Sequence, residues 1–463
     1  MAQKVHPYIP NMVPEVQAEM LKVIGANSIM ELYSCIPEEL QLKEDLKLPT
    51  ALTEYELRRH IEGILNKNTS TKEYLNFLGA GCWQHFVPAV CDEINQRSEF
   101  LTAYAGEPYE DHGRFQALFE YQSLVAELVD MDVVNVPTFD WGQAAATSIR
   151  MAARITGRKK VLLAKTVAPE RSKIIVNYGT PELEFEFVQF DTKSGALDLS
   201  DLNAKLTDEV AALYFENPSY LGFIEAQGSE ISTLLKENQT LMVVGVDPIS
   251  LGVLAPPSHY GADIVCGDLQ PLGMHMNFGG GQAGFIATHN DVKFVNEYPS
   301  RLFGIVPTVK EGEYGFGDVA YDRTSFALRE KGKESVGTQT ALWGITAGVY
   351  LALLGPDGIQ EIGQTIMQNS QYAVQQLNQI PSLSGSRLDS PFFKEFIVDF
   401  NQTCVTVEEI NQRLVERKIF GGKDLSKEFP EFGQSALFCV TEVHTKEDID
   451  YLVQSLNEIL TKQ

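Results

Sequence analysis

A chain of 463 residues, with 44% hydrophobic and 21% charged residues, has the composition of a globular protein with more than one domain. The formal net charge of −25 disfavours nucleic acids and anionic membrane surfaces as partners, because proteins bind both through Lys and Arg. The six cysteines form no CxxC pair, and no stretch resembles a secretory signal or the roughly 20 apolar residues of a membrane span. We therefore expect a cytoplasmic protein.

The first 74 residues are predicted to be mostly helical, with prolines at the entry and many charges within the helical periods. A segment of this kind usually lies along another surface and forms no core of its own. From residue 75 onward, short apolar runs alternate with helical ones, which is typical of a largely parallel sheet covered on both faces. The strands are predicted at 160–164, 185–190, 211–215, 241–246, 262–266 and 283–287.

The organisation changes in the last third of the chain. Residues 340–355 form an almost wholly apolar helix that ends at Gly355-Pro356 and is expected to pack inside a domain. Strand-like runs at 392–400 and 435–443 precede a final helix, which opens with the capping-box-like Thr445-Lys446-Glu447-Asp448. The predicted parts are an N-terminal helical segment (1–74), a large α/β domain (75–330) and a small α+β domain (331–463).

Asp247 follows the predicted strand 241–246 directly. In enzymes that use pyridoxal phosphate, an aspartate at such a place pairs with the pyridinium nitrogen of the cofactor. Asp-Pro is equally a common start of a turn, and both interpretations stay open. Residues 139–154 could begin a phosphate-binding helix, but their small side chains favour close helix–sheet packing. Residues 216–225 suit a loop at the carboxyl edge of the sheet, or an ordinary connection.

Two non-helical stretches, 77–90 and 98–114, carry polar side chains that loops can present to a ligand. The eight histidines show no HExxH spacing and accompany no cysteine pair, so we predict no metal site. The chain also lacks GxSxG, a P-loop and a GxGxxG after a strand. The polar residues of the two stretches are His85, Tyr104, Glu107, Tyr109, Glu110 and His112.

Residues 262–285, ADIVCGDLQPLGMHMNFGGGQAGF, look like the active-site strand and loop of a pyridoxal-phosphate enzyme, in which a lysine forms the Schiff base. No Lys or Arg occurs between Lys236 and Lys293. Without an amine in this loop, the chain cannot form that Schiff base here.

Long stretches in the same order resemble one family, glycine dehydrogenase (decarboxylating) subunit 1, the α subunit of the glycine cleavage system P-protein. They include HPYIPNMVPEVQAEMLKVIG, FLGAGCWQHFVPAV, RSEFLTAY, FEYQSLVAELVDMDVVN, ENPSYLGFIE, NFGGGQAGF, REKGKESVGTQTAL and VYLALLGPDGI. The resemblance implies a fold-type-I, aminotransferase-like architecture. The positions that match the lysine of lysine-bearing relatives fall near Pro271 or Leu272.

The resemblance also implies a division of labour between two chains. A homologous subunit 2 would carry the lysine and the pyridoxal phosphate, and this chain would bind no cofactor covalently. The two would form an α2β2 assembly that releases CO2 from glycine and transfers the aminomethyl group to the lipoyl arm of H-protein. Asp247 would be a vestigial cofactor residue, and Tyr104, Glu107, Tyr109, Glu110 and His85 would be candidates for contact with the partner's site.

The chain departs from the family pattern at two places. It reads Tyr104-Ala105-Gly106-Glu107-Pro108-Tyr109-Glu110 where the family usually reads YTPYQPE, and 139–144 is FDWGQA where the family reads like YDGATA. A paralogue for another small amine, or a non-catalytic structural or regulatory protein, is therefore an alternative. A self-sufficient decarboxylase would need another lysine, such as Lys293 or Lys310, to reach the cofactor.

Overall fold

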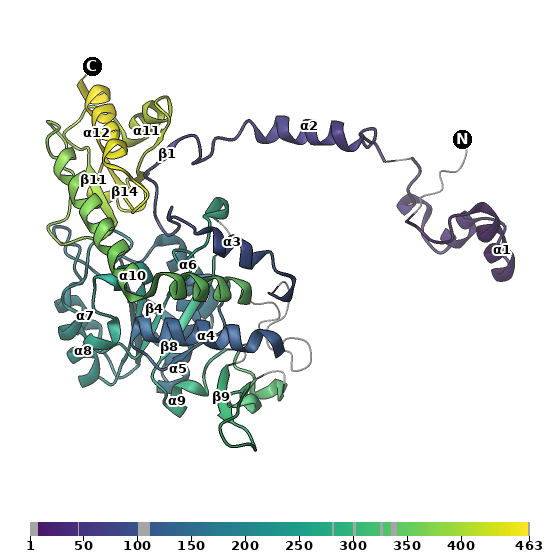
Figure 1. The fold of residues 1–463 in the computed structure, drawn as a ribbon, viewed down its shortest axis with the longest axis horizontal. Coiled ribbons are helices and arrows are strands. Elements are labelled where there is room, and N and C mark those ends of the chain that lie inside the picture. The colour runs from purple at the N-terminus through teal and green to yellow at the C-terminus, as the bar shows by residue number, and fades with distance from the viewer. Residues whose placement is uncertain are drawn as a thin grey trace. The chain divides into compact units, whose positions relative to one another are not determined.

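The computed structural model describes residues 8–44, 46–100, 112–279, 282–299, 302–324, 327–334 and 340–461. The chain forms two compact units, Met1–Thr69 and Ser70–Gln463 (Figure 1). All of the predicted strands lie in the second unit.

The first unit contains two α-helices, α1 (Pro14–Ile24) and α2 (Glu54–Leu65), and two short 3-10 helices, η1 (Ile29–Tyr33) and η2 (Glu38–Leu40). A capping box at Thr53 starts α2, as its sequence allows. Extended stretches separate these elements, so the unit is less helical than expected. None of its described residues is buried, which means that the unit has no core of its own.

The second unit is built on a seven-stranded sheet with the strand order β2-β8-β7-β6-β5-β3-β4. Strands β3 to β7 pair in parallel, whereas β8 is antiparallel to β7, and β2 is antiparallel to β8. Every residue of β5, β7 and β8 is buried, which explains why these strands are continuous apolar runs. The strands are β2 (Val133–Val134), β3 (Lys160–Ala164), β4 (Glu184–Val188), β5 (Val210–Glu216), β6 (Leu241–Val246), β7 (Ile264–Asp268) and β8 (Gly284–Thr288).

Helices cover the sheet. Helix α5 (Trp141–Thr156) packs on β5 to β8, and α4 (His112–Val129) lies beside α10 (Ala341–Leu377) (Figure 1). The remaining α-helices of this part are α3 (Ala89–Asn95), α6 (Pro169–Gly179), α7 (Leu199–Lys205), α8 (Gly228–Glu237) and α9 (Val292–Val295). The 3-10 helices are η3 (Ser98–Phe100), η4 (Pro248–Gly252), η5 (Pro257–Tyr260), η6 (Asn277–Gly279), η7 (Tyr321–Arg323) and η8 (Arg329–Lys331).

Helix α10 is broken at Gly355, whose φ of 61° and ψ of −176° are not helical, and Pro356 follows it. The predicted end of the apolar helix at Gly355-Pro356 is therefore a kink between two helical stretches. Among the described residues, α10 is the one helix whose length and apolar composition would suffice to cross a membrane. It packs against α4, α3 and α12, and 44% of its most apolar stretch is buried.

The C-terminal part has its own hydrophobic core, around a small antiparallel sheet of β11, β14 and β13. Strand β1 pairs in parallel with β12, so the chain passes along this part before it enters the large sheet. The elements are β1 (Leu75–Asn76), β11 (Glu395–Asp399), α11 (Val407–Val415), β12 (Ile419–Phe420), β13 (Lys423–Asp424), η9 (Pro430–Phe432), β14 (Ser435–Cys439) and α12 (Lys446–Thr461).

The predicted α/β fold with a mostly parallel sheet is confirmed, and all eight predicted strands form. The hairpin of β9 (Phe303–Pro307) and β10 (Tyr314–Asp318) was not expected. The domain boundaries predicted at residues 74 and 330 stay predictions.

Candidate functional site

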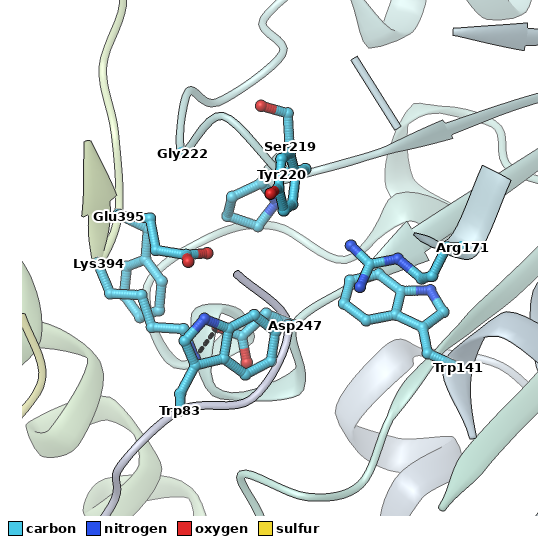
Figure 2. A pocket seen from close by; sticks show the side chains of 12 residues that line it. Trp83, Trp141, Arg171, Ser219, Tyr220, Gly222, Asp247, Lys394 and Glu395 are labelled. Atoms are coloured by element: carbon cyan, nitrogen blue, oxygen red, sulfur yellow. Dashed lines mark ion pairs between the residues drawn. The ribbon is translucent and has the colours of Figure 1, made fainter. Parts of the chain in front are cut away.

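A pocket lies at the carboxyl edge of the large sheet, where ligands bind in open α/β folds (Figure 2). The loops after β5 and β6 form one side of it. The loop after β1 and the residues just before β11 close it from the C-terminal part. Segments far apart in the sequence therefore meet at the place where the sequence predicted a vestigial cofactor residue.

Asp247 follows β6 directly, and both of its carboxylate oxygens are engaged. Oδ1 accepts a hydrogen bond of 3.2 Å from the backbone N–H of Ile249, which makes Asp247 the cap of η4. Oδ2 lies 2.7 Å from Nζ of Lys394, and the dashed line in Figure 2 marks this ion pair. Both side chains are buried. The turn interpretation of Asp247 fits the contact with Ile249, and the cation that Asp247 meets is the chain's own Lys394.

The ammonium group of Lys394 has two further contacts. It lies 3.6 Å from the ring centroid of Trp83, and it donates to Nε2 of His85 at 3.1 Å. An ammonium group cannot accept a hydrogen bond, so Nε2 of His85 is the acceptor and its proton sits on Nδ1. That Nδ1–H points at Oε2 of Glu442, 2.8 Å away. The four residues form a continuous chain of contacts from Glu442 through His85 and Lys394 to Asp247.

Glu442 carries the negative charge at one end of this series of contacts. Burial raises the pKa of Glu442, but the imidazole of His85 and the backbone N–H of Phe86 outweigh burial and bring the pKa down to about 2. The N–H of Phe86 donates to Oε1 at 2.8 Å. Glu442 is therefore ionised at neutral pH and holds His85 in the tautomer that accepts from Lys394.

Trp83 is held in place by Gln270, the residue before Pro271. The Gln270 amide accepts from the backbone N–H of Trp83 at 3.1 Å and donates to its carbonyl at 2.9 Å. The loop in which lysine-bearing relatives carry the Schiff-base lysine thus anchors an indole in this chain. Leu272 is fully buried, and neither it nor Pro271 has an amine.

Arg171, from α6, is paired with a carboxylate on the opposite side of the pocket. Its Nε and Nη2 donate to the two carboxylate oxygens of Glu216 at 2.7 and 2.8 Å. The guanidinium lies over the ring of Trp141, 4.0 Å from its centroid (Figure 2). The pair uses two of the five N–H donors and compensates the charge, which weakens Arg171 as a ligand for a phosphate group.

The start of α5 is capped by the chain's own carboxylate. Oδ1 of Asp140 accepts from the backbone N–H of Gln143 at 2.7 Å. A Cβ on Gly142 would lie 2.8 Å from Cδ1 of Ile174, so this glycine permits close packing of α5 and α6. The packing interpretation of residues 139–154 fits these contacts. A carboxylate at the helix N-terminus also repels a phosphate there.

These residues do not fit pyridoxal phosphate. The loop lacks the lysine, Asp247 is paired with Lys394, and a carboxylate stands at the helix N-terminus. The pocket leaves an internal volume of only about 10 Å³, which is the space of about one water molecule. Lys293 and Lys310 do not line the pocket, and their exposed ammonium groups pair with Asp291 and Glu313. The self-sufficient decarboxylase therefore has no support in this pocket.

The predicted contact residues are placed as follows. Tyr104, Glu107, Tyr109 and Glu110 lie in 101–111, outside the described residues. His85 is buried between Glu442 and Lys394, where it serves the chain's own pocket. The sequence reasoning missed Lys394, Trp83, Trp141, Arg171, Gln270 and Glu442. One signal was available for Lys394, since it interrupts the apolar run 392–400 with a charge.

The model of the glycine cleavage system P-protein family matches residues 6–456. The chain belongs to this family. Its relatives include proteins named probable glycine dehydrogenase (decarboxylating) subunit 1. The one from Staphylothermus marinus is 38% identical over 99% of this chain and 99% of its own length. The one from Carboxydothermus hydrogenoformans is 40% identical over 97% of this chain and 99% of its own length.

This P-protein chain also resembles solved structures. A crystal structure of glycine decarboxylase (P-protein) of the glycine cleavage system in inhibitor-bound form has a TM-score of 0.84 and 32% identity, and covers 99% of this chain and 100% of that one. A NifS-like protein shares the fold with a TM-score of 0.62 at 13% identity, covering 84% of this chain and 100% of its own. The predicted family and the fold-type-I architecture are confirmed.

Proposed function

We propose that this chain is the cofactor-free subunit of a two-chain glycine dehydrogenase (decarboxylating), and that a homologous second subunit supplies the Schiff-base lysine and the pyridoxal phosphate. The observation that carries the proposal is the pocket, which the chain fills with its own Lys394 and Trp83. The subunit 1 relatives match the chain over nearly its whole length, which supports the assignment to this half of the enzyme. The complete enzyme releases CO2 from glycine and passes the aminomethyl group to the lipoyl arm of H-protein.

The first unit supports a partnership with a second chain. It has no buried residue among those described, although α1 and α2 are rich in apolar side chains. Burying one such side chain is worth about 1.5–3 kcal/mol, so a unit of this kind gains stability only when another surface covers it. The exposed apolar residues include Val16, Met20 and Val23 of α1 and Leu57, Ile61 and Ile64 of α2. A contact with the second subunit, within an α2β2 assembly, would cover them.

Reconstitution tests the proposal. The purified chain should retain no pyridoxal phosphate after desalting and should be inactive towards glycine. Mixed with the lysine-bearing subunit, it should elute as one complex, show the visible band of the bound cofactor and, with lipoyl H-protein as acceptor, release labelled CO2 from carboxyl-labelled glycine. Full activity of the lysine-bearing subunit alone would refute the proposal.

The same experiment separates the alternatives. A non-catalytic paralogue would elute apart from the lysine-bearing subunit at every mixing ratio. A paralogue for another small amine would form the complex and take up the cofactor, but would release no CO2 from glycine. Both results would leave the fold and the family unchanged and would remove the assigned reaction.

A further inference from the structure

We infer that the former cofactor pocket is now a closed binding site for a primary ammonium group, and that the chain's own Lys394 is its resident ligand. The inference concerns a site within this chain and does not depend on the proposed reaction. Figure 2 shows the Lys394 side chain reaching past Trp83 to Asp247 at the centre of the pocket.

The partners around Nζ match the chemistry of a primary ammonium group. Such a group has three N–H donors and no acceptor. The pocket offers a carboxylate at 2.7 Å (Asp247), an imidazole nitrogen at 3.1 Å (His85) and an indole face at 3.6 Å (Trp83). A carboxylate and the face of a Trp ring both attract a cation, and their attraction is strong where water is excluded. The site is therefore complementary to a small buried cation that can donate a hydrogen bond to His85.

The acceptors are fixed before the ammonium group arrives. Glu442 sets the tautomer of His85 so that Nε2 carries a lone pair, and Gln270 clamps the backbone of Trp83 on both sides. The carboxylate of Glu395, next to Lys394, accepts a hydrogen bond from the backbone N–H of Ala80. A buried charge is tolerated only when such partners are already in place, because it loses its hydration.

The arrangement keeps one feature of a cofactor site and changes its ligand. An aspartate after this strand meets the ring nitrogen in pyridoxal-phosphate enzymes. Here the same carboxylate meets an ammonium group that comes from the segment before β11, in the C-terminal part. The ion pair thus ties the C-terminal part to the large sheet. The volume left over, about 10 Å³, gives no space for a second ligand.

Chemical rescue in the full-length chain tests the inference. Lys394→Ala removes the propylammonium portion of the side chain and leaves a cavity with Asp247 unpaired. Lys394→Met removes the charge but fills most of the space of the lysine side chain, so it is the matched control. We expect n-propylammonium chloride to raise the melting temperature of Lys394→Ala by several degrees in a saturable manner. The same salt should not change the melting temperature of the wild type or of Lys394→Met. Tetramethylammonium, which has no N–H, should not change the melting temperature of any of the three proteins.

Two results would overturn the inference. One is an equal shift by n-propylammonium in Lys394→Ala and Lys394→Met, which would mean a general salt effect. The other comes from a variant that does not need the cavity. If the ion pair holds the pocket, the double variant Asp247→Asn/Lys394→Met should melt above Lys394→Met, because the unpaired buried carboxylate is gone. A double variant no more stable than Lys394→Met would show that Asp247 does not need the ammonium group. Neither readout measures glycine decarboxylation, so a failure here is distinguishable from a failure of the proposed function.

Discussion

Glu442→Gln removes the charge that orients His85 while keeping the size of the side chain. The pKa of Glu442 falls from its ordinary 4.5 to about 2 in the folded chain. Each pKa unit corresponds to about 1.36 kcal/mol, so the ionised carboxylate stabilises the folded state at neutral pH by at most about 3 kcal/mol. The Glu442 side chain is only 12% exposed, so solvent screening takes little from this value. Attraction to His85 acts in full only on a charged ring, whereas the hydrogen bonds from His85 and Phe86 act on either form, so we expect the glutamine variant to lose between about 1 and 3 kcal/mol at pH 7.

The pH dependence gives the sign of the effect. A carboxyl group whose folded pKa is lowered contributes stability that is complete above its unfolded pKa and is lost as the pH falls through the folded value. The wild type should therefore exceed Glu442→Gln by the full amount above pH 4.5, and the difference should shrink between pH 4.5 and about 2. Titrating groups that do not contact Glu442 are common to both proteins and cancel in the difference.

Urea unfolding followed by tryptophan fluorescence measures this difference, because Trp83 and Trp141 report on the pocket. Glu120→Gln, at an exposed carboxylate of α4, is the control and should change the free energy of unfolding by less than about 0.5 kcal/mol. A difference between the wild type and Glu442→Gln that stays constant from pH 7 down to 3 would refute the argument.

Three further substitutions address the pocket and its supports. Pro271→Lys restores an amine to the loop, yet we expect no pyridoxyl adduct at this position after borohydride reduction, because the remaining volume is about 10 Å³; an adduct mapped there would contradict the filled pocket. Gly222→Ala should cost more than about 4 kcal/mol in a melt, since its Cβ would lie 2.0 Å from the carbonyl oxygen of Glu395 at a φ of +89°. Gly157→Ala, at a φ of +68° in open space, should cost only about 1 kcal/mol; equal costs would argue against the close approach. Arg171→Lys breaks a bidentate pair and should cost about 2 kcal/mol in the same assay, and an unchanged melt would show that the pair is not needed.

The sheet was predictable because its strands are local signals. Strands such as β5 and β7 are buried on both faces, so their sequences are unbroken apolar runs. Strands β1, β2 and β12 have two residues each and depend on partners far along the chain, so no local pattern reveals them. Pairing of β1 with β12 also places residues 75 and 76 beside the C-terminal part, which no local pattern reveals.

The missing lysine was likewise predictable, because the sequence alone shows that no Lys or Arg lies between Lys236 and Lys293. The residues that fill the pocket could not be predicted in this way. Lys394 and His85 are 309 positions apart, and Gln270 and Trp83 are 187 apart. Each of these residues has an ordinary alternative as a surface or core side chain. Only the fold brings them together, and it does so through the segment before β11 and the loop after β1.

The cofactor content of the assembled enzyme tests the central claim most directly. The complex of this chain with its lysine-bearing partner should be reduced with borohydride, and the pyridoxyl groups counted and mapped to peptides. We predict one pyridoxyl group for each pair of chains, always on the partner's peptide. Two groups per pair, or any group attached to the described residues of this chain's pocket, would contradict the account.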